Sequence, residues 1–109
     1  MAGAPGVPLR RPTHPATAPR YHVRIKSLTE RARWEALAIE LPDEMTACWD
    51  HLANSPTAML PNERCHRLKG ALATIWQYKP TTGHNKRVWY TVDDAQRRVL
   101  VTAVYEQHP

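Results

Sequence analysis

The first regular pattern along the chain is an alternation of apolar and polar residues from Tyr21 to Lys26. Successive side chains of a strand point to opposite faces, so this pattern predicts a strand with one buried face. The tetrapeptide SLTE at 27–30 follows directly and has the S-x-x-E form of a capping box. We therefore expect a helix to begin there.

Two apolar stripes with helical spacing come next. They consist of Trp34, Leu37, Ala38 and Leu41, and then of Met45, Cys48, Trp49 and Leu52. Residues three and four positions apart share one face of a helix, so each stripe predicts a helix that packs on a core. Pro42 ends or bends the first helix and suits the first turn of the second. Residues 27–54 are therefore expected to form a helical hairpin that stops at Asn54-Ser55-Pro56.

The second half of the chain has the pattern of a sheet. After a loop at 55–63, strands are expected at 64–69, 74–79, 86–92 and 98–105, with a turn at Gly70 and a loop at 80–85. The last run, RVLVTAVY, is almost continuously apolar, which is typical of a central strand. The element order is β-α-α-β-β-β-β. This order predicts an α+β domain with the helical hairpin on one side of a mostly antiparallel sheet.

Composition limits how much of the chain joins this domain. At 109 residues the chain is long enough for one hydrophobic core. Residues 1–19 hold five of the ten prolines and little apolar surface, so we expect a disordered tail and a domain at 20–109. No apolar run has the length of a membrane span or of a secretory signal, and we expect a cytoplasmic protein.

The net charge of +5 is unevenly distributed. Residues 1–26 carry five basic groups and no acid, residues 27–50 six acids and two bases, and residues 51–87 six bases and one acid. The helical part is therefore acidic and the sheet part basic. This polarity suggests two partners of opposite charge.

The two cysteines allow two interpretations. Cys48 with His51, and Cys65 with His66, offer four potential zinc ligands, but their spacing is unlike that of closed zinc sites. Cys48 also belongs to the second apolar stripe, which favours buried free thiols. We therefore expect no metal and no cofactor.

Aromatic residues are interleaved with the basic residues between 64 and 92. In the strand 86–92, alternation separates Val88, Tyr90 and Val92 from a second set of Arg87, Trp89 and Thr91. If the aliphatic set faces the helices, Arg87 and Trp89 lie on the open face, where Trp89 either stacks on a base or packs under a loop. Phosphates bind cations and bases stack on aromatic rings. The predicted RNA contacts are Arg64, His66, Lys69, Lys86, Trp89 and Tyr105.

Four motifs carry a resemblance to a known family. They are RLKG at 67–70, WQYK at 76–79, KRVWYTVDD at 86–94 and VLVTAVY at 99–105, followed by a histidine near the terminus. Over residues 20–109 the chain resembles the RelE/ParE superfamily of toxin–antitoxin toxins, and within it the RelE-, HigB- and YoeB-like branch. The resemblance implies ribosome-dependent mRNA cleavage that stops translation. It also implies a hetero-oligomer with a cognate antitoxin, with the ribosome and mRNA as the other partners.

The resemblance also implies catalytic roles for four residues. The family's motif positions fall on Arg67, Lys79 and Arg87, and its terminal proton donor falls on His108, with Tyr105 as the substitute. The family's general base has no clear match; His66 is nearest, and Glu63 lies upstream. Two alternatives stay open, namely a ParE-like poison of DNA gyrase and an inactive relative that only binds RNA or protein.

These residue types also suit the chemistry. Metal-free RNA cleavage proceeds by attack of a 2′-hydroxyl on the adjacent phosphate, which needs a base, an acid and cations around the phosphate. Histidine titrates near neutral pH and serves as acid or base. Arginine remains charged and binds a phosphate with two hydrogen bonds.

Overall fold

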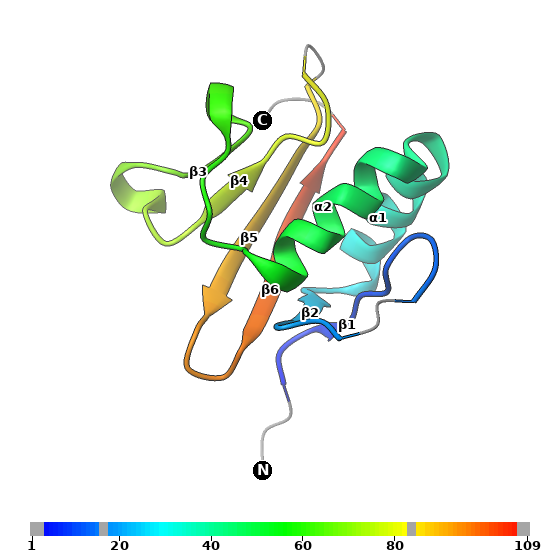
Figure 1. Ribbon diagram of the computed structural model, residues 1–109, viewed down its shortest axis with the longest axis horizontal. Helices are drawn as coiled ribbons and strands as arrows, with labels where there is room; N and C mark the ends of the chain where they lie inside the picture. The colour runs from blue at the N-terminus through cyan, green and yellow to red at the C-terminus, as the bar shows by residue number, and fades with distance from the viewer. Residues whose placement is uncertain (1–3, 16–17, 83–84, 107–109) are drawn as a thin grey trace.

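The computed structural model describes residues 4–15, 18–82 and 85–106. Within these ranges, two α-helices pack on a six-stranded sheet (Figure 1). The α+β class expected from the sequence is confirmed. Neither helix combines the length and the apolar character that crossing a membrane requires; this finding covers the described ranges.

The sheet combines strands from both ends of the chain. Its strands are β1 (Val7–Pro8), β2 (His22–Ile25), β3 (Cys65–Arg67), β4 (Trp76–Tyr78), β5 (Arg87–Asp93) and β6 (Arg98–Tyr105). Their order across the sheet is β1-β2-β6-β5-β4-β3. β6 pairs in parallel with β2 and antiparallel with β5, so the apolar run does form a central strand.

β3 and β4 are shorter than the sequence pattern predicts. The connection between them leaves the sheet in a 3₁₀ turn, η2 (Gly70–Leu72), and Gly70 there has a φ of 66°. This left-handed conformation favours glycine. The Leu68 N–H donates to the Ile75 carbonyl over 2.8 Å and closes the hairpin just beyond the ladder.

The helical hairpin consists of α1 (Leu28–Glu40) and α2 (Pro42–Asn54). Ser27 caps α1 as predicted, because its hydroxyl accepts the Glu30 N–H over 3.2 Å. The Glu30 carboxylate accepts the Val104 N–H over 2.8 Å. This bond joins the first turn of α1 to the end of β6.

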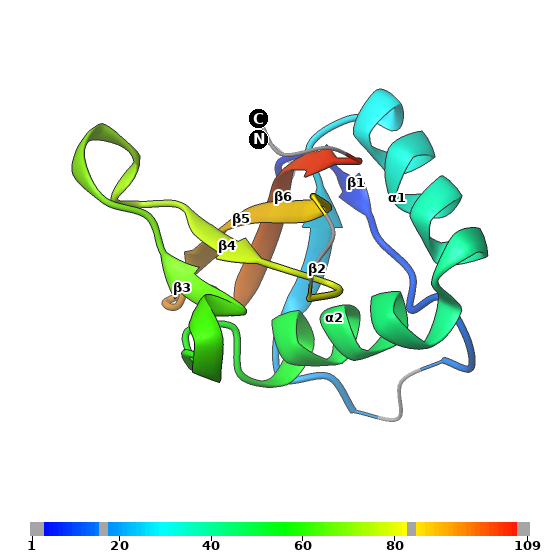
Figure 2. The ribbon, with the colours of Figure 1, turned by 90° about the horizontal axis from the view of Figure 1, so that it is seen from above.

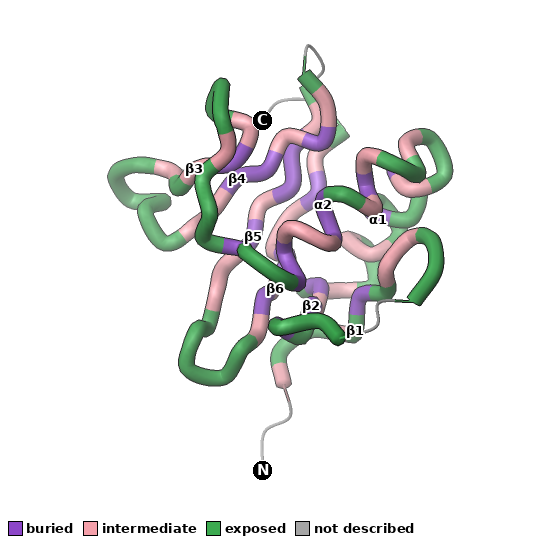
Figure 3. Tube along the Cα trace, viewed as in Figure 1, coloured by how far each residue is buried: buried purple, intermediate pink, exposed green. Residues whose placement is uncertain are grey.

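The core lies between the helices and one face of the sheet (Figure 3). Both predicted stripes contribute buried side chains, including Trp34 and Leu37 from α1 and Met45 and Leu52 from α2. The sheet contributes buried aliphatic and aromatic side chains: Val23, Ile25, Val88, Tyr90, Val99, Val101 and Val104. Figure 2 shows both helices along one side of the sheet, with β3 and β4 at the end far from α1. The predicted packing of the helices is confirmed.

The tail is where the structure departs from the sequence-based expectation. Its described N-terminal part, residues 4–15, is called the N-terminal arm. In it β1 pairs antiparallel with β2, and Leu9 is 5% exposed in the core. The Trp49 indole donates to the Leu9 carbonyl over 2.9 Å, and Arg11 binds both carboxylate oxygens of Asp50. The arm is ordered despite its prolines because the edge of β2 offers hydrogen-bond partners for its backbone and the helical hairpin offers an apolar surface for Leu9.

Candidate functional site

Strand pairing at the β3 end of the sheet sorts the basic side chains by face. β3 pairs with β4, and β4 pairs with β5, all antiparallel. Val88 and Tyr90 are fully buried toward the helices, whereas Trp89 is half-buried, so alternation places Trp89 and Arg87 on the opposite face. The predicted division of this strand into two sets is therefore confirmed.

Three cations meet in one pocket of about 620 Å³ on this side of the molecule. Each cation comes from a different segment: the turn before β3, the residue after β4, and the start of β5. The lining residues are Asn62, Arg64, Lys79, Thr81, Thr82, Asn85 and Arg87. Among the described residues, the lining has three positive charges, neutral amides and hydroxyls, and no carboxylate. Such a lining suits an anion.

Arg64 and Thr81 supply unused hydrogen-bonding capacity in the pocket. The Arg64 Nη2 group makes long bonds of 3.4 and 3.3 Å to the carbonyl oxygens of Lys79 and Pro80. Its Nε and the Thr81 hydroxyl are buried without a hydrogen-bond partner among the described residues. A buried donor without a partner is costly, and an oxygen-rich ligand would satisfy it.

Arg87 is more enclosed than an open sheet face implies. It is 9% exposed, and its Nη1 donates to the Lys86 carbonyl over 2.8 Å. Burial lowers the pKa of the Arg87 guanidinium, because desolvation disfavours its charged form. A bound phosphate would raise this pKa again, because its negative charge favours the charged guanidinium. The expectation of a freely exposed Arg87 is thus corrected: the loop that follows β4 forms the pocket wall around it.

A row of aromatic and polar side chains lies beside the pocket. The Trp89 indole donates to the Gln77 side-chain oxygen over 2.8 Å and meets the Tyr105 ring edge-on at 5.0 Å. His66 pairs with Gln77 across the β3–β4 ladder, so alternation places it in the same row. Residues two apart on a strand are about 7 Å apart, so this row lies about one nucleotide from Lys79. His66, Trp89 and Tyr105 thus share the face of the pocket.

Arg67 lies apart from the other predicted catalytic residues. It pairs with Trp76, and the Trp76 ring stacks on buried Tyr90 at 6.5 Å. Alternation puts Arg67 on the same face as buried Cys65, which is opposite to the face of Arg87. Of the four residues, the structure brings Lys79 and Arg87 together, and Arg64 joins them in the pocket. His108 lies outside the described residues.

The remaining predicted RNA contacts do not line the pocket. The Lys86 ammonium is 3.6 Å from the Glu40 carboxylate at the end of α1. Lys69 is exposed just before η2. The His66 Nδ1 atom is 3.1 Å from the Glu63 carbonyl, which orients the ring.

Buried tyrosine and cysteine side chains form a network beneath the site. The Tyr90 hydroxyl donates to the Pro56 carbonyl over 2.6 Å and lies 3.1 Å from the Cys65 sulfur. Because the single phenol proton is used toward Pro56, the thiol is the donor in the second contact. Burial raises the pKa of both the Tyr90 phenol and the Cys65 thiol. Both groups are therefore neutral, and their role is structural.

The cysteines are free and buried, as expected from the apolar stripe. In the part of the chain that the structure describes, no three His, Cys, Asp or Glu side chains gather as potential metal ligands. Sequence patterns missed four neutral pocket residues: Asn62, Thr81, Thr82 and Asn85. For three of them the one signal was composition, because Thr81-Thr82 and Asn85 flank a glycine in a loop between two basic residues.

Neither the protein-family models nor the curated protein sequences include a match. Among solved structures, the chain is similar to one chain in the crystal structure of the toxin–antitoxin complex RelBE2 from Mycobacterium tuberculosis. The sequence identity is 21%, the alignment covers 86% of this chain and 98% of that chain, and the TM-score is 0.47.

Proposed function

We propose that this chain is the toxin of a toxin–antitoxin system and that it cleaves mRNA on the ribosome. The observation that carries the proposal is the pocket in which Arg64, Lys79 and Arg87 converge from three segments. Three cations around one cavity suit a phosphate whose negative charge increases during cleavage. The resemblance of the sequence motifs to RelE-like toxins supports the same reaction.

In the proposed mechanism the scissile phosphate occupies the pocket. Arg64 and Arg87 bind its oxygens through planar guanidinium groups, and the Lys79 ammonium adds a third positive charge. The 2′-hydroxyl attacks the phosphorus atom, and the bond to the 5′-oxygen breaks. This leaves a 2′,3′-cyclic phosphate and a free 5′-hydroxyl. The cations stabilise the charge of the transition state.

Two protons must move during this reaction. His66 lies on the face of the pocket, two residues along the chain from Arg64, and is the candidate for the base that takes the 2′-hydroxyl proton. His108 is the candidate for the acid that protonates the leaving oxygen, and its role rests on the sequence resemblance. Trp89 and Tyr105 offer ring surface for the base next to the phosphate.

The same electrostatics suggest how the toxin would be inhibited. An acidic segment of a cognate antitoxin would neutralise the pocket and exclude the RNA. The toxin would then exist as an inactive hetero-oligomer in the cytoplasm until the antitoxin is removed. This arrangement matches the basic charge of residues 51–87.

Primer extension on ribosome-bound mRNA tests the proposal. We expect the parent chain to produce discrete cuts and Arg87→Ala to abolish them, with Arg20→Ala as the control because Arg20 is exposed outside the site. His108→Gln should slow cleavage while RNA binding persists. Uncut mRNA at chain concentrations that bind the ribosome would refute the enzymatic part of the proposal.

One observation favours a second candidate, a binding protein without catalysis. The described residues that line the pocket supply cations, amides and hydroxyls but no histidine or carboxylate. An inactive RNA-binding relative, or a ParE-like poison of DNA gyrase, would need no proton carrier. Measuring DNA supercoiling and translation after induction distinguishes these candidates, because loss of supercoiling before loss of translation favours the gyrase poison.

A further inference from the structure

The side of α1 that faces away from the core carries an apolar stripe. Leu28, Ala32, Ala36 and Ile39 recur at helical spacing, and all four are exposed. The two large side chains, Leu28 and Ile39, are 61% and 85% exposed. Figure 2 shows α1 at the margin of the molecule, with no other element of the described ranges covering its outer side. An exposed helix face is ordinarily polar, so this face calls for a partner.

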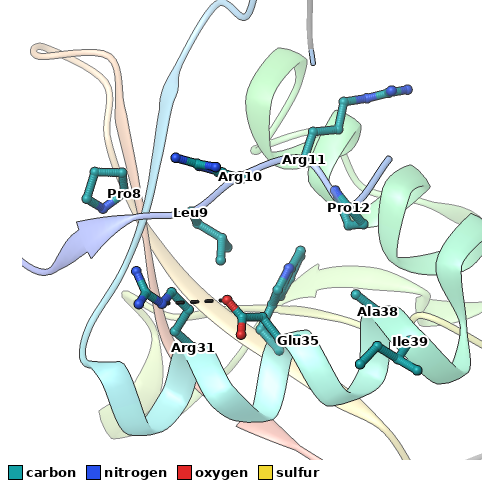
Figure 4. Close-up of a pocket in the computed structure, with 10 residues that line it drawn as sticks. Pro8, Leu9, Arg10, Arg11, Pro12, Arg31, Glu35, Ala38 and Ile39 are labelled. Atoms are coloured by element: carbon teal, nitrogen blue, oxygen red, sulfur yellow. Dashed lines mark ion pairs between the residues drawn. The ribbon is translucent and has the colours of Figure 1, made fainter. Parts of the chain in front are cut away.

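Beside Ile39 the stripe borders a groove along the N-terminal arm. The groove measures about 620 Å³ and lies between α1 and arm residues 8–12 (Figure 4). Leu9 points into it from the arm, and Ala38 lines it from the helix. Arg10, Arg11, Arg31 and Glu35 also line the groove, so the apolar stripe of α1 is bordered by charged side chains.

The two large residues of this face lie at nearly equal distances from the middle of α1. The midpoint between Leu28 and Ile39 falls at the centre of the exposed part of the helix, between Arg33 and Trp34. If a second α1 lies antiparallel across this midpoint, Leu28 of each copy meets Ile39 of the partner subunit. The small Ala32 and Ala36 lie between them and allow the helix axes to approach to about 8 Å.

The charges beside the face fit the same arrangement. Arg31 and Glu35 flank it, and their side chains are 3.7 Å apart and 41% and 64% exposed. In an antiparallel pair related by a two-fold axis, the Arg31–Glu35 side of one α1 lies beside the same side of the other α1. The two helices run in opposite directions. Arg31 then lies within reach of Glu35 of the partner subunit, and the opposite charges meet twice. A two-fold interface requires this self-complementarity, and an arbitrary partner does not.

We propose that α1 mediates self-association of this chain into a two-fold dimer. The occupant of the outer face is α1 of a second copy, in antiparallel orientation. A helix of 13 residues is about 20 Å long, so the interface is small and the dimer weak. The dimer is independent of the proposed RNA cleavage, because it uses no residue of the cationic pocket.

Sedimentation equilibrium of the full chain over a range of concentrations tests the proposal. We expect a reversible monomer–dimer equilibrium, and Ile39→Asp should raise the dimer dissociation constant about tenfold or more. Met59→Asp is the matched control, because Met59 is 71% exposed in a loop away from α1. Circular dichroism verifies that both variants keep the fold.

A charge exchange tests the antiparallel arrangement itself. Glu35→Arg alone should weaken the dimer, because it brings like charges together, and adding Arg31→Glu should restore it. A chain that stays monomeric at all concentrations would overturn the proposal. A dimer that Ile39→Asp leaves unaffected would also overturn it. A monomer whose α1 face binds only a helix of another protein would overturn it as well.

Discussion

The backbone N–H of Lys79 donates to the carbonyl oxygen of Arg64 over 2.7 Å, and the Arg64 side chain donates back to the carbonyl oxygen of Lys79 over 3.4 Å. These two bonds join the turn before β3 to the end of β4. They hold two cations of the pocket beside each other although the residues are 15 positions apart in the sequence. The local fold therefore determines the position of this part of the site before any ligand binds.

The first prediction compares Arg64 with Arg67. Arg64→Ala should slow the proposed mRNA cleavage by a factor of order 10², because it removes a preorganised donor from the proposed phosphate site. Arg67→Ala should leave most of the activity, because Arg67 lies on the opposite face of β3. Primer extension with both variants gives the answer. If the two substitutions impair cleavage equally, the reacting phosphate does not bind in the pocket.

The second prediction concerns the burial of Arg87. A cation on an open sheet face could be removed at a cost below about 0.5 kcal/mol. Because Arg87 is 9% exposed, we expect Arg87→Ala to lower the free energy of unfolding by about 1–2 kcal/mol. Arg87→Met should recover most of that loss, since its unbranched apolar stem fills much of the same space. Urea denaturation measures all three proteins.

The same variants distinguish packing from charge. Arg87→Met should remain folded but not cleave RNA, and Arg87→Lys should cleave poorly because an ammonium replaces a two-bonded guanidinium. Full cleavage by Arg87→Met would show that the charge of residue 87 is not used.

Much of the fold could be predicted because its signals are local. The stripe that includes Trp34 and Leu37 identified a helix, and the apolar run at 98–105 identified the central strand. β1 gave no such signal, since Val7–Pro8 forms a strand only because the edge of β2 is beside it. Pairing of this kind depends on distant residues, which periodicity does not detect.

The candidate site was predictable only in part, for a similar reason. Alternation along β5 correctly separated Arg87 from Val88 and Tyr90. It could not show that Arg64, rather than Arg67, lies beside Lys79. That depends on the turn η1 (Pro61–Glu63), in which Asn62 and Glu63 have φ values of 58° and 57° and direct the chain into β3. No pattern of apolar residues indicates such backbone angles.

The third prediction concerns pH and stability. The His51 ring packs against Tyr78 at 5.3 Å, and its Nε2 atom is buried without a hydrogen-bond partner in the described part of the chain. Burial lowers the pKa of His51, so the unfolded chain binds the proton more tightly than the folded chain. The resulting contribution to stability is complete above the unfolded pKa of about 6.5 and is lost as the pH falls below it.

Urea denaturation between pH 8 and about pH 5 tests this prediction. The free energy of unfolding should decrease toward low pH, and His51→Phe, which keeps a ring beside Tyr78, should make the decrease smaller. His22→Asn is the control because His22 is exposed. An unchanged pH dependence in His51→Phe would mean that another group is responsible.

The fourth prediction tests the N-terminal arm. Leu9 is 5% exposed and its carbonyl accepts the Trp49 indole, so Leu9→Ala should lower the free energy of unfolding by about 2–3 kcal/mol. Arg10→Ala, one residue further along an exposed stretch, should change it by less than about 0.5 kcal/mol. If the tail were disordered, the two variants would have the same free energy of unfolding. Equal urea midpoints would therefore show that the arm is not packed on the domain.

The last prediction uses salt to count the cations at the site. Single-stranded RNA releases condensed counterions when a protein neutralises its phosphates, so affinity falls with salt at a slope of about 0.7 per phosphate contact. Binding of an oligouridylate should therefore weaken steeply with salt, and Arg64→Ala should reduce the slope by about 0.7 because it removes one contact. Arg20→Ala should leave the slope unchanged, because Arg20 lies outside the pocket. Fluorescence anisotropy at several salt concentrations measures the three slopes. Equal salt slopes for the parent chain and Arg64→Ala would show that RNA is bound elsewhere, even if the two affinities differ. A variant that only disturbs the structure weakens binding equally at every salt concentration.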